Sequence, residues 1–331
     1  MLHTVTGAVA GETLDVLLAA ETVLRAPGPI PRNRGGAATD AAFERAPVSM
    51  ARLGRLQMGA LNRDDRTLVA SDAEPGLRRL SDVGRAGVVA LAEWAVPAEP
   101  EARTAALVGL SRASGVAIVR GTVGLEGFTE TVPDADTLHT RILTELRHSD
   151  APAGVVGRVG PLDPDDAAAR DRLAGAASAA RAGGVALVLA AAPTLADTDR
   201  LLAVVDSAGL RRERVILTRV ARFPIDALLE RGTAVCFDDL GRIPTVRTRV
   251  SDHEVALAIL RGAELGAGNR LLVSAGIRVK HRLTAWGGNG WEFISEQFLP
   301  HLRRLGASER LLHGVAVGNA ARMLGRAEPC T

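Results

Sequence analysis

The sequence predicts an α/β protein that folds as a single-domain (β/α)8, or TIM, barrel over residues 1–331. Eight short apolar segments alternate with stretches of helical periodicity, and such runs are typical of strands covered on both faces of a parallel sheet. Eight strand–helix units in 331 residues fit a closed barrel. A Gly-x-Gly-x-x-Gly motif, which would favour an open dinucleotide-binding sheet, is absent after the first strand.

The strands are expected in chain order from the N-terminus. They cover residues 13–20, 87–94, 116–122, 154–159, 185–191, 215–219, 234–238 and 270–275. Amphipathic helices lie between them, for example over 165–182 and 252–265, and a last helix covers 311–324. Residues 25–71, rich in proline and glycine, predict a long loop with short helices over the barrel mouth. Loops of this length are usually lids or binding loops, and disorder is the alternative.

Composition excludes several classes of function. The 40 basic and 38 acidic residues are scattered, so no basic stripe points to a nucleic acid partner. No apolar run approaches the roughly 20 residues that span a bilayer, so we expect no membrane partner. The two cysteines, Cys236 and Cys330, make no disulfide framework. With no signal peptide pattern at the N-terminus, the expected location is the cytoplasm.

Short motifs along the chain resemble those of a known family. Residues 4–9 read TVTGAV, residues 237–241 read FDDLG and residues 286–291 read WGGNGW. In this order they resemble the phosphotriesterase family of the amidohydrolase superfamily, and further matches cover almost the whole chain. The resemblance implies a barrel with two divalent metals at its mouth, held by four histidines, an aspartate and a bridging lysine or glutamate.

The chain departs from this family at the metal ligands. Aligned residue by residue, the ligand positions fall on Ala20, Thr22, Arg158 (or Gly157 if the bridge is a lysine), Leu189, Arg219 and Gly276. Hydrolytic metal sites need converging imidazole or carboxylate donors, and two arginines would oppose the cations. We therefore expect no metal and no cofactor. Histidines at 20 and 22 alone should not restore a metal, whereas the inherited barrel leaves restoration by the whole set open.

Arg158 and Arg219 are the most informative pair. Two guanidinium groups at a barrel mouth can bind a carboxylate or a phosphate in bidentate fashion. Alternatively, they pair with Glu93 or Asp238 and fill the vacated metal site, because buried charges need partners. The first reading predicts an anion site formed by the two arginines, with the two carboxylates at its edge.

Other candidates lie near the predicted strand ends. Glu93, Asp238 and Lys280 are candidate catalytic groups, as acid, base or amine. Each also has a structural reading, as a counter-ion, a cap or a loop residue. Trp94, Trp286 and Trp291 are candidate substrate-binding residues that line a pocket, or else aromatic residues that pack over the barrel top.

Two function classes follow. The first is a metal-independent enzyme of the lyase, cyclase or isomerase type, and the second is a ligand-binding pseudoenzyme. Either would take an anionic small molecule, a carboxylate or a phosphate. The alternative is a metal-dependent ester or lactone hydrolase like the rest of the family. The oligomeric state, a homodimer included, is left open by the sequence.

Overall fold

The computed structural model describes residues 1–27, 38–92, 100–122, 134–148, 150–245 and 248–325, and it confirms the predicted (β/α)8 barrel. The parallel strands are β3 (Val16–Glu21), β4 (Ala86–Ala90), β5 (Ala117–Arg120), β6 (Val155–Val159), β7 (Ala186–Ala190), β8 (Val215–Thr218), β9 (Ala234–Phe237) and β10 (Leu271–Val273). They form one sheet in the order β3-β4-β5 and a second in the order β6 to β10. A parallel bridge between Gly121 and Val155 joins the two sheets.

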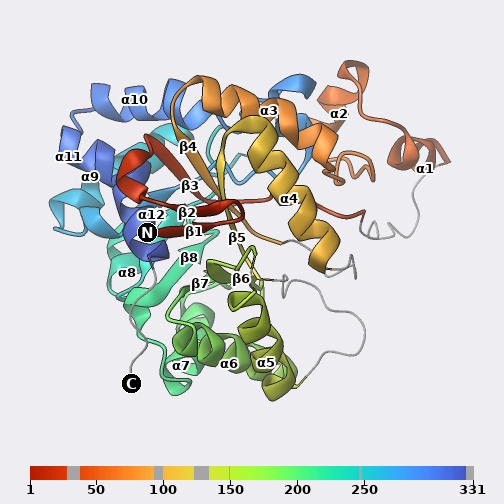
Figure 1. Cartoon of the computed structure of the whole chain (residues 1–331). Helices are drawn as coiled ribbons and strands as arrows, with labels where there is room; N and C mark the ends of the chain where they lie inside the picture. Colours follow the sequence, from red (N-terminus) through yellow and green to blue (C-terminus); the bar gives the residue numbers. More distant parts are fainter. Residues whose placement is uncertain (28–37, 93–99, 123–133, 149, 246–247, 326–331) are drawn as a thin grey trace.

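Helices surround these strands (Figure 1). They are α3 (Ala70–Asp82), α4 (Pro100–Ser114), α5 (Ala135–Leu146), α6 (Ala167–Ala182), α7 (Leu195–Ser207), α8 (Ile225–Leu229) and α9 (Asp252–Glu264), with α10 (Leu299–Arg304), α11 (Glu309–His313) and α12 (Asn319–Leu324) after the last strand. Asp134, Asp166, Thr194 and Ser251 cap their helices by accepting backbone N–H groups. Within the described ranges, no helix is both long and apolar enough to cross a bilayer.

Two apolar clusters explain why the strands are buried on both faces. Alternate strand residues point into the barrel, where Leu17, Val89, Val188, Ile216 and Cys236 belong to one cluster. Their neighbours, such as Leu18, Val88 and Leu187, pack outward against the helices. A strand between two apolar layers is apolar at nearly every position. The strand bounds predicted from the sequence therefore lie close to the observed ones.

An N-terminal hairpin was not predicted. Strand β1 (Leu2–Thr4) pairs with β2 (Gly7–Val9) in antiparallel fashion. Leu2 is buried in the inner cluster, and the backbone N–H of Val5 donates to the Ile118 carbonyl at 2.9 Å. The hairpin therefore lies against the barrel end at which the strands begin, opposite the end that carries barrel active sites.

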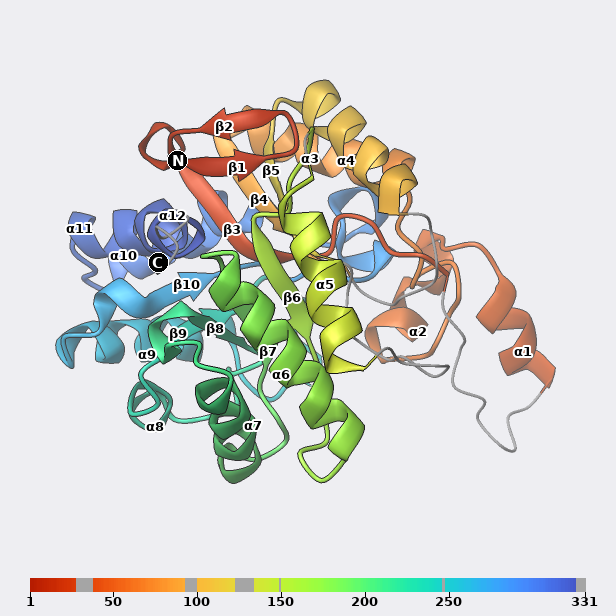
Figure 2. The same cartoon turned by 60° about the horizontal axis from the view of Figure 1, so that its bottom comes forward.

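The segment after β3 carries short helices, as expected for part of residues 25–71. The described part contains α1 (Ala38–Arg45) and α2 (Leu53–Gln57), which lie outside the ring of the other helices (Figure 2). An ion pair between Lys280 Nζ and Asp64 Oδ1 at 2.8 Å joins this segment to the loop after β10. Residues 28–37 of the predicted loop lie outside the described residues.

Candidate functional site

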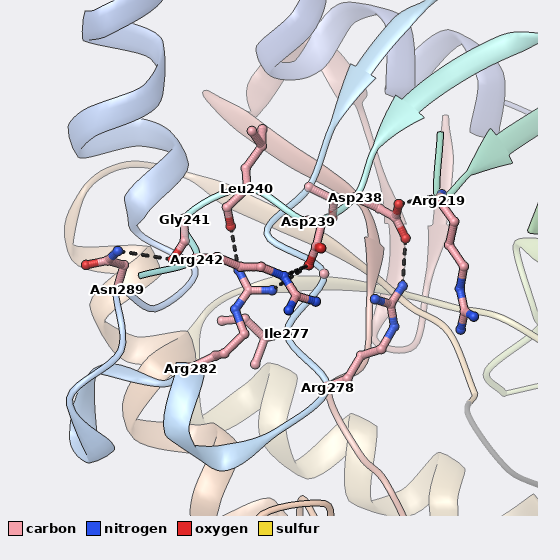
Figure 3. A network of polar contacts seen from close by, with 12 residues as sticks. Arg219, Asp238, Asp239, Leu240, Gly241, Arg242, Ile277, Arg278, Arg282 and Asn289 are labelled. Atoms are coloured by element: carbon pink, nitrogen blue, oxygen red, sulfur yellow. Dashed lines mark hydrogen bonds and ion pairs between the residues drawn. The ribbon is translucent and has the colours of Figure 1, made fainter. Parts of the chain in front are cut away.

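The candidate site lies where β6, β8 and β9 end and where the loop after β10 begins. These segments bring together Arg158, Arg219, Asp238 and Arg278, the last three of which are drawn in Figure 3. Barrel enzymes build their sites at this carboxyl end of the strands. The position agrees with the sequence-based expectation for three of the four residues, and Arg278 is an addition.

Asp238 is the centre of the group, with 2% of its surface exposed. Its Oδ2 lies 2.6 Å from Arg278 Nη2 and 3.3 Å from Arg158 Nη2. Its Oδ1 accepts the backbone N–H of Arg219 at 2.6 Å. Burial alone would raise the pKa of Asp238, but Arg278, Arg158 and the Arg219 N–H outweigh burial and lower it. The carboxylate is therefore charged at neutral pH and held by three donors.

Arg158 is an internal residue of the barrel. Its side chain is fully buried, and besides Asp238 it contacts the Ala20 carbonyl at 3.5 Å from Nη2. This contact places the guanidinium between β6 and β3. The predicted pairing of Arg158 with Asp238 is thus present, and Arg158 makes further interactions as well.

Arg219 follows β8 in an unusual backbone conformation. Its φ of 59° makes it the one non-glycine residue with a positive φ in the described parts of the chain. A left-handed backbone costs a residue with a Cβ roughly 1–2 kcal/mol. The short hydrogen bond from its N–H to Asp238 holds this conformation. Strained residues of this kind gather at functional sites, where the surrounding structure maintains them.

Arg278 is the site residue that the sequence analysis missed. Its side chain is 17% exposed, and its ion pair with Asp238 is the shortest in the group. Arg25, at the start of the segment after β3, donates to the Arg278 carbonyl at 2.7 Å. The only signal in the sequence was its place two residues after Gly276, on a loop that lies beside the end of β9.

A second set of contacts holds the turn that carries Asp238 (Figure 3). Arg282 Nη1 lies 3.0 Å from Asp239 Oδ1, and its Nη2 donates to the Leu240 carbonyl at 2.6 Å. The Gly241 N–H donates to Asp252 of α9, and its carbonyl accepts from Asn289 at 3.0 Å. Burial lowers the pKa of Arg282 to about 10. Arg282 therefore serves as a buried structural cation behind the site.

Lys280 lies in an ion-pair cluster away from Asp238. Its Nζ is 2.8 Å from Asp64 Oδ1 and 3.0 Å from Asp72 Oδ2. Burial alone would lower the pKa of Lys280, but these two carboxylates raise it. The amine is therefore protonated at neutral pH. Trp286, a partly buried residue, has its ring centroid 5.5 Å from Nζ, within the range of a cation–π contact.

Trp291 is fully buried and belongs to the outer core. Its Nε1 donates to Glu21 Oε2 at 2.9 Å. Glu21 also accepts from Ser274 Oγ at 2.5 Å and from the backbone N–H groups of Gly276 and Ile277 at 3.0 Å. Burial raises the pKa of Glu21 despite these donors. Trp291 thus holds the carboxyl of Glu21 at the end of β3 from within the core.

Two predicted site residues cannot be placed. Glu93 and Trp94 lie outside the described residues, so their proposed roles as acid or base and as pocket wall stay predictions. Strand β4 ends at Ala90, and the residues described after it end at Ala92. Of the two predicted acidic site residues, Asp238 is therefore the one that the structure describes, and it lies among the arginines.

The residues present do not fit the family's metal pair. The aligned positions carry Ala20, Thr22, Leu189, Arg158 and Arg219, none of which offers an imidazole or a carboxylate. Across the described ranges, no three His, Cys, Asp or Glu side chains gather in a way that could hold a metal ion. Asp238, the carboxylate paired with Arg158, accepts from three donors.

The fold and the site together define a barrel protein whose candidate site is built from arginines at the carboxyl ends of its strands. A model of the phosphotriesterase family matches residues 110–324, and the chain belongs to that family. N-acetyltaurine hydrolase of Dictyostelium discoideum is 23% identical over 200 residues, which are 57% of this chain. The match spans 54%, about half, of that relative's length.

Solved structures support the same fold. A resiniferatoxin-binding protein from Rhodobacter sphaeroides has a TM-score of 0.83 and 25% identity, covering 98% of this chain and 94% of its own. A lactonase from Listeria monocytogenes has a TM-score of 0.74 and 16% identity, covering 99% of both chains. The second likeness bears on the fold alone. Both likenesses in fold cover nearly the whole chain.

Proposed function

We propose that this protein binds an anionic small molecule, a carboxylate or a phosphate, at Arg219 and Arg278, without a metal centre. The observation that carries the proposal is the strained backbone of Arg219, held by Asp238 at a strand end on the active face. Strain that is maintained by a buried carboxylate indicates that the direction of this side chain matters.

The three arginines divide into two kinds. Arg158 is fully buried and pairs with Asp238, so it stabilises the carboxylate from inside the barrel. Arg219 and Arg278 are partly exposed, and Figure 3 shows both residues beside Asp238. Planar guanidinium groups match the two oxygens of a carboxylate or phosphate. Arg219 and Arg278 would thus hold the ligand, while Asp238 holds these two arginines in place.

The described acid and base candidates favour binding over catalysis. A general base needs a pKa near the working pH. The pKa of Asp238 is lowered, and that of Lys280 is raised by its two carboxylates. Burial raises the pKa of the Cys236 thiol well above its usual value. The solved structure at 25% identity is also named for a ligand that it binds. A ligand-binding pseudoenzyme is therefore our proposal.

Calorimetric titration with sulfate and with phosphate tests the proposal. Arg219→Ala and Arg278→Ala should each weaken binding about tenfold to a hundredfold, since a hydrogen bond to a charged group is worth about 1.5–3 kcal/mol. Arg303→Ala is the matched control, because Arg303 is an exposed arginine of α10 paired with Glu309. Equal affinities in all four proteins, or no binding by the wild type, would contradict the proposal.

The alternative is a metal-dependent ester or lactone hydrolase, favoured by the hydrolase and lactonase names among the relatives. It predicts lactone hydrolysis that rises with added zinc and is lost with a chelator. The proposal predicts no such zinc-dependent rate.

A further inference from the structure

The backbone at Gly276 leaves no room for a side chain. Gly276 has a φ of 59°, and a Cβ built there would lie 1.7 Å from the Asp238 carbonyl oxygen and 2.7 Å from its carbon. Real Cβ atoms essentially never approach another atom within 3.0 Å. The obstacle is the backbone of Asp238, directly after β9, rather than a flexible side chain. Gly276 is the position that aligns with the family's metal-binding aspartate.

The same loop is fixed from its other side. The N–H groups of Gly276 and Ile277 both donate to the buried Glu21 carboxyl of β3. Trp291 and Ser274 donate to this carboxyl as well, so four donors hold it. The loop therefore lies between the Asp238 carbonyl and Glu21, and it cannot move away from one without losing contacts to the other.

The bridging position is closed as well. Gly157 has a φ of 115°, and a Cβ there would lie 2.6 Å from the Val188 carbonyl oxygen and 2.9 Å from the Val159 nitrogen. A bridging lysine at this position is therefore blocked by backbone. A bridging glutamate in place of Arg158 would remove a buried cation beside Asp238 and put a second carboxylate there, where like charges repel.

From these contacts we infer that this barrel excludes the family's metal pair through its backbone, and not only through its missing side chains. Restoring every ligand side chain does not restore the site. The sequence had left that restoration open, because it shows residue types but not the closeness of β9 to the loop after β10. The inference does not depend on whether Arg219 and Arg278 bind an anion.

Two glycine variants test the steric part. Gly276→Ala is compared with Gly266→Ala, because Gly266 also has a left-handed φ, of 78°, but nothing lies within 4 Å of its Cβ position. Both variants carry the cost of a left-handed alanine, and only the first carries the clash. We expect Gly276→Ala to lower the melting temperature several times more, or to prevent folding while Gly266→Ala folds. Equal melting temperatures for the two variants would overturn the inference.

A restored variant tests the consequence for metals. It combines Ala20→His, Thr22→His, Leu189→His, Arg219→His, Arg158→Glu and Gly276→Asp. The protein is dialysed against zinc and then against buffer, and retained zinc is measured by elemental analysis. We expect a protein that fails to fold, or one that folds and retains no stoichiometric zinc. A folded protein that retains two equivalents of zinc would overturn the inference, whatever the anion titrations show.

Discussion

At the scale of single residues, Asp238 organises the site. It accepts from Arg278, from Arg158 and from the Arg219 backbone while almost wholly buried. A buried carboxylate is stable only when its charge is compensated, and removing one partner of such a group leaves an uncompensated charge. Asp238 therefore links the internal cation to the two outer arginines.

Asp238→Asn should destabilise the protein by about 3–5 kcal/mol, because it strands buried guanidinium charge. Urea denaturation measures this loss, and Asp206→Asn, at an exposed pair with Arg212, should cost under about 1 kcal/mol. The folded-state pKa of Asp238 is lowered, so its stabilisation is present above the unfolded pKa and lost as pH falls through the folded pKa. The difference in unfolding free energy between the wild type and Asp238→Asn should thus be constant above about pH 5 and should narrow below about pH 4. A gap that widens on acidification would contradict this assignment.

The strain at Arg219 makes its own prediction. Glycine adopts a left-handed φ without cost, so Arg219→Gly should be more stable than Arg219→Ala by about 1–2 kcal/mol. Both variants should lose sulfate binding to the same degree. Denaturation curves for the pair check the first point, and equal stabilities would mean that the backbone relaxes when the side chain is removed.

At the scale of elements, Lys280 fastens the segment after β3 to the loop after β10. It lies between Asp64 of that segment and Asp72 of α3. The backbone N–H of Lys280 donates to the Asp65 carbonyl at 2.8 Å. The backbone N–H of His281 donates to the Asp65 carboxylate at 2.9 Å. The described helices α1 and α2 therefore depend on the barrel loop for their position.

Lys280→Met should loosen this segment while sparing the barrel. We expect amide hydrogen exchange in residues 40–68 to quicken about tenfold or more, with the strands unchanged, because local openings are governed by local contacts. Arg78→Met, at an exposed pair on α3, is the control. The raised pKa of Lys280 means that its contribution is present below the unfolded pKa and lost as pH rises through the folded pKa. Faster exchange in the strands as well would show that Lys280 supports the whole fold.

The elements also show what the sequence could predict. Strand β7 runs over Ala186–Ala190 against an expected 185–191, because a strand between two apolar layers has an unmistakable pattern. Arg219 and Asp238 were located from strand ends for the same reason. Arg278 and the hairpin β1–β2 were missed, since each depends on contacts between distant segments. No local pattern marks the approach of Asp238 to Gly276.

At the scale of the whole molecule, the barrel closes between its last and first strands through side chains. Ser274 Oγ accepts the Ala20 N–H at 3.0 Å and donates to Glu21 Oε1 at 2.5 Å. The Glu21 carboxyl then holds the start of the loop that carries Arg278. The contacts of Ser274 and Glu21 that close the barrel therefore also position Arg278 at the candidate site.

Ser274→Ala should weaken this closure. It removes the acceptor of a buried N–H and a donor to a buried carboxyl, which together cost about 1–3 kcal/mol. Ser81→Ala, at a partly exposed serine of α3, should change stability by less than about 0.5 kcal/mol. Thermal unfolding of the two variants provides the comparison, and similar melting temperatures would contradict the proposed role of Ser274.

We propose that arginines, and not metal ions, make this barrel an anion site. The most direct measurement is the affinity for sulfate of the wild-type protein, determined by calorimetry once with excess EDTA and once with equimolar zinc. We expect the same dissociation constant in both, since Arg219 and Arg278 would bind the anion without a metal. Binding that appears only with zinc and vanishes with EDTA would contradict it.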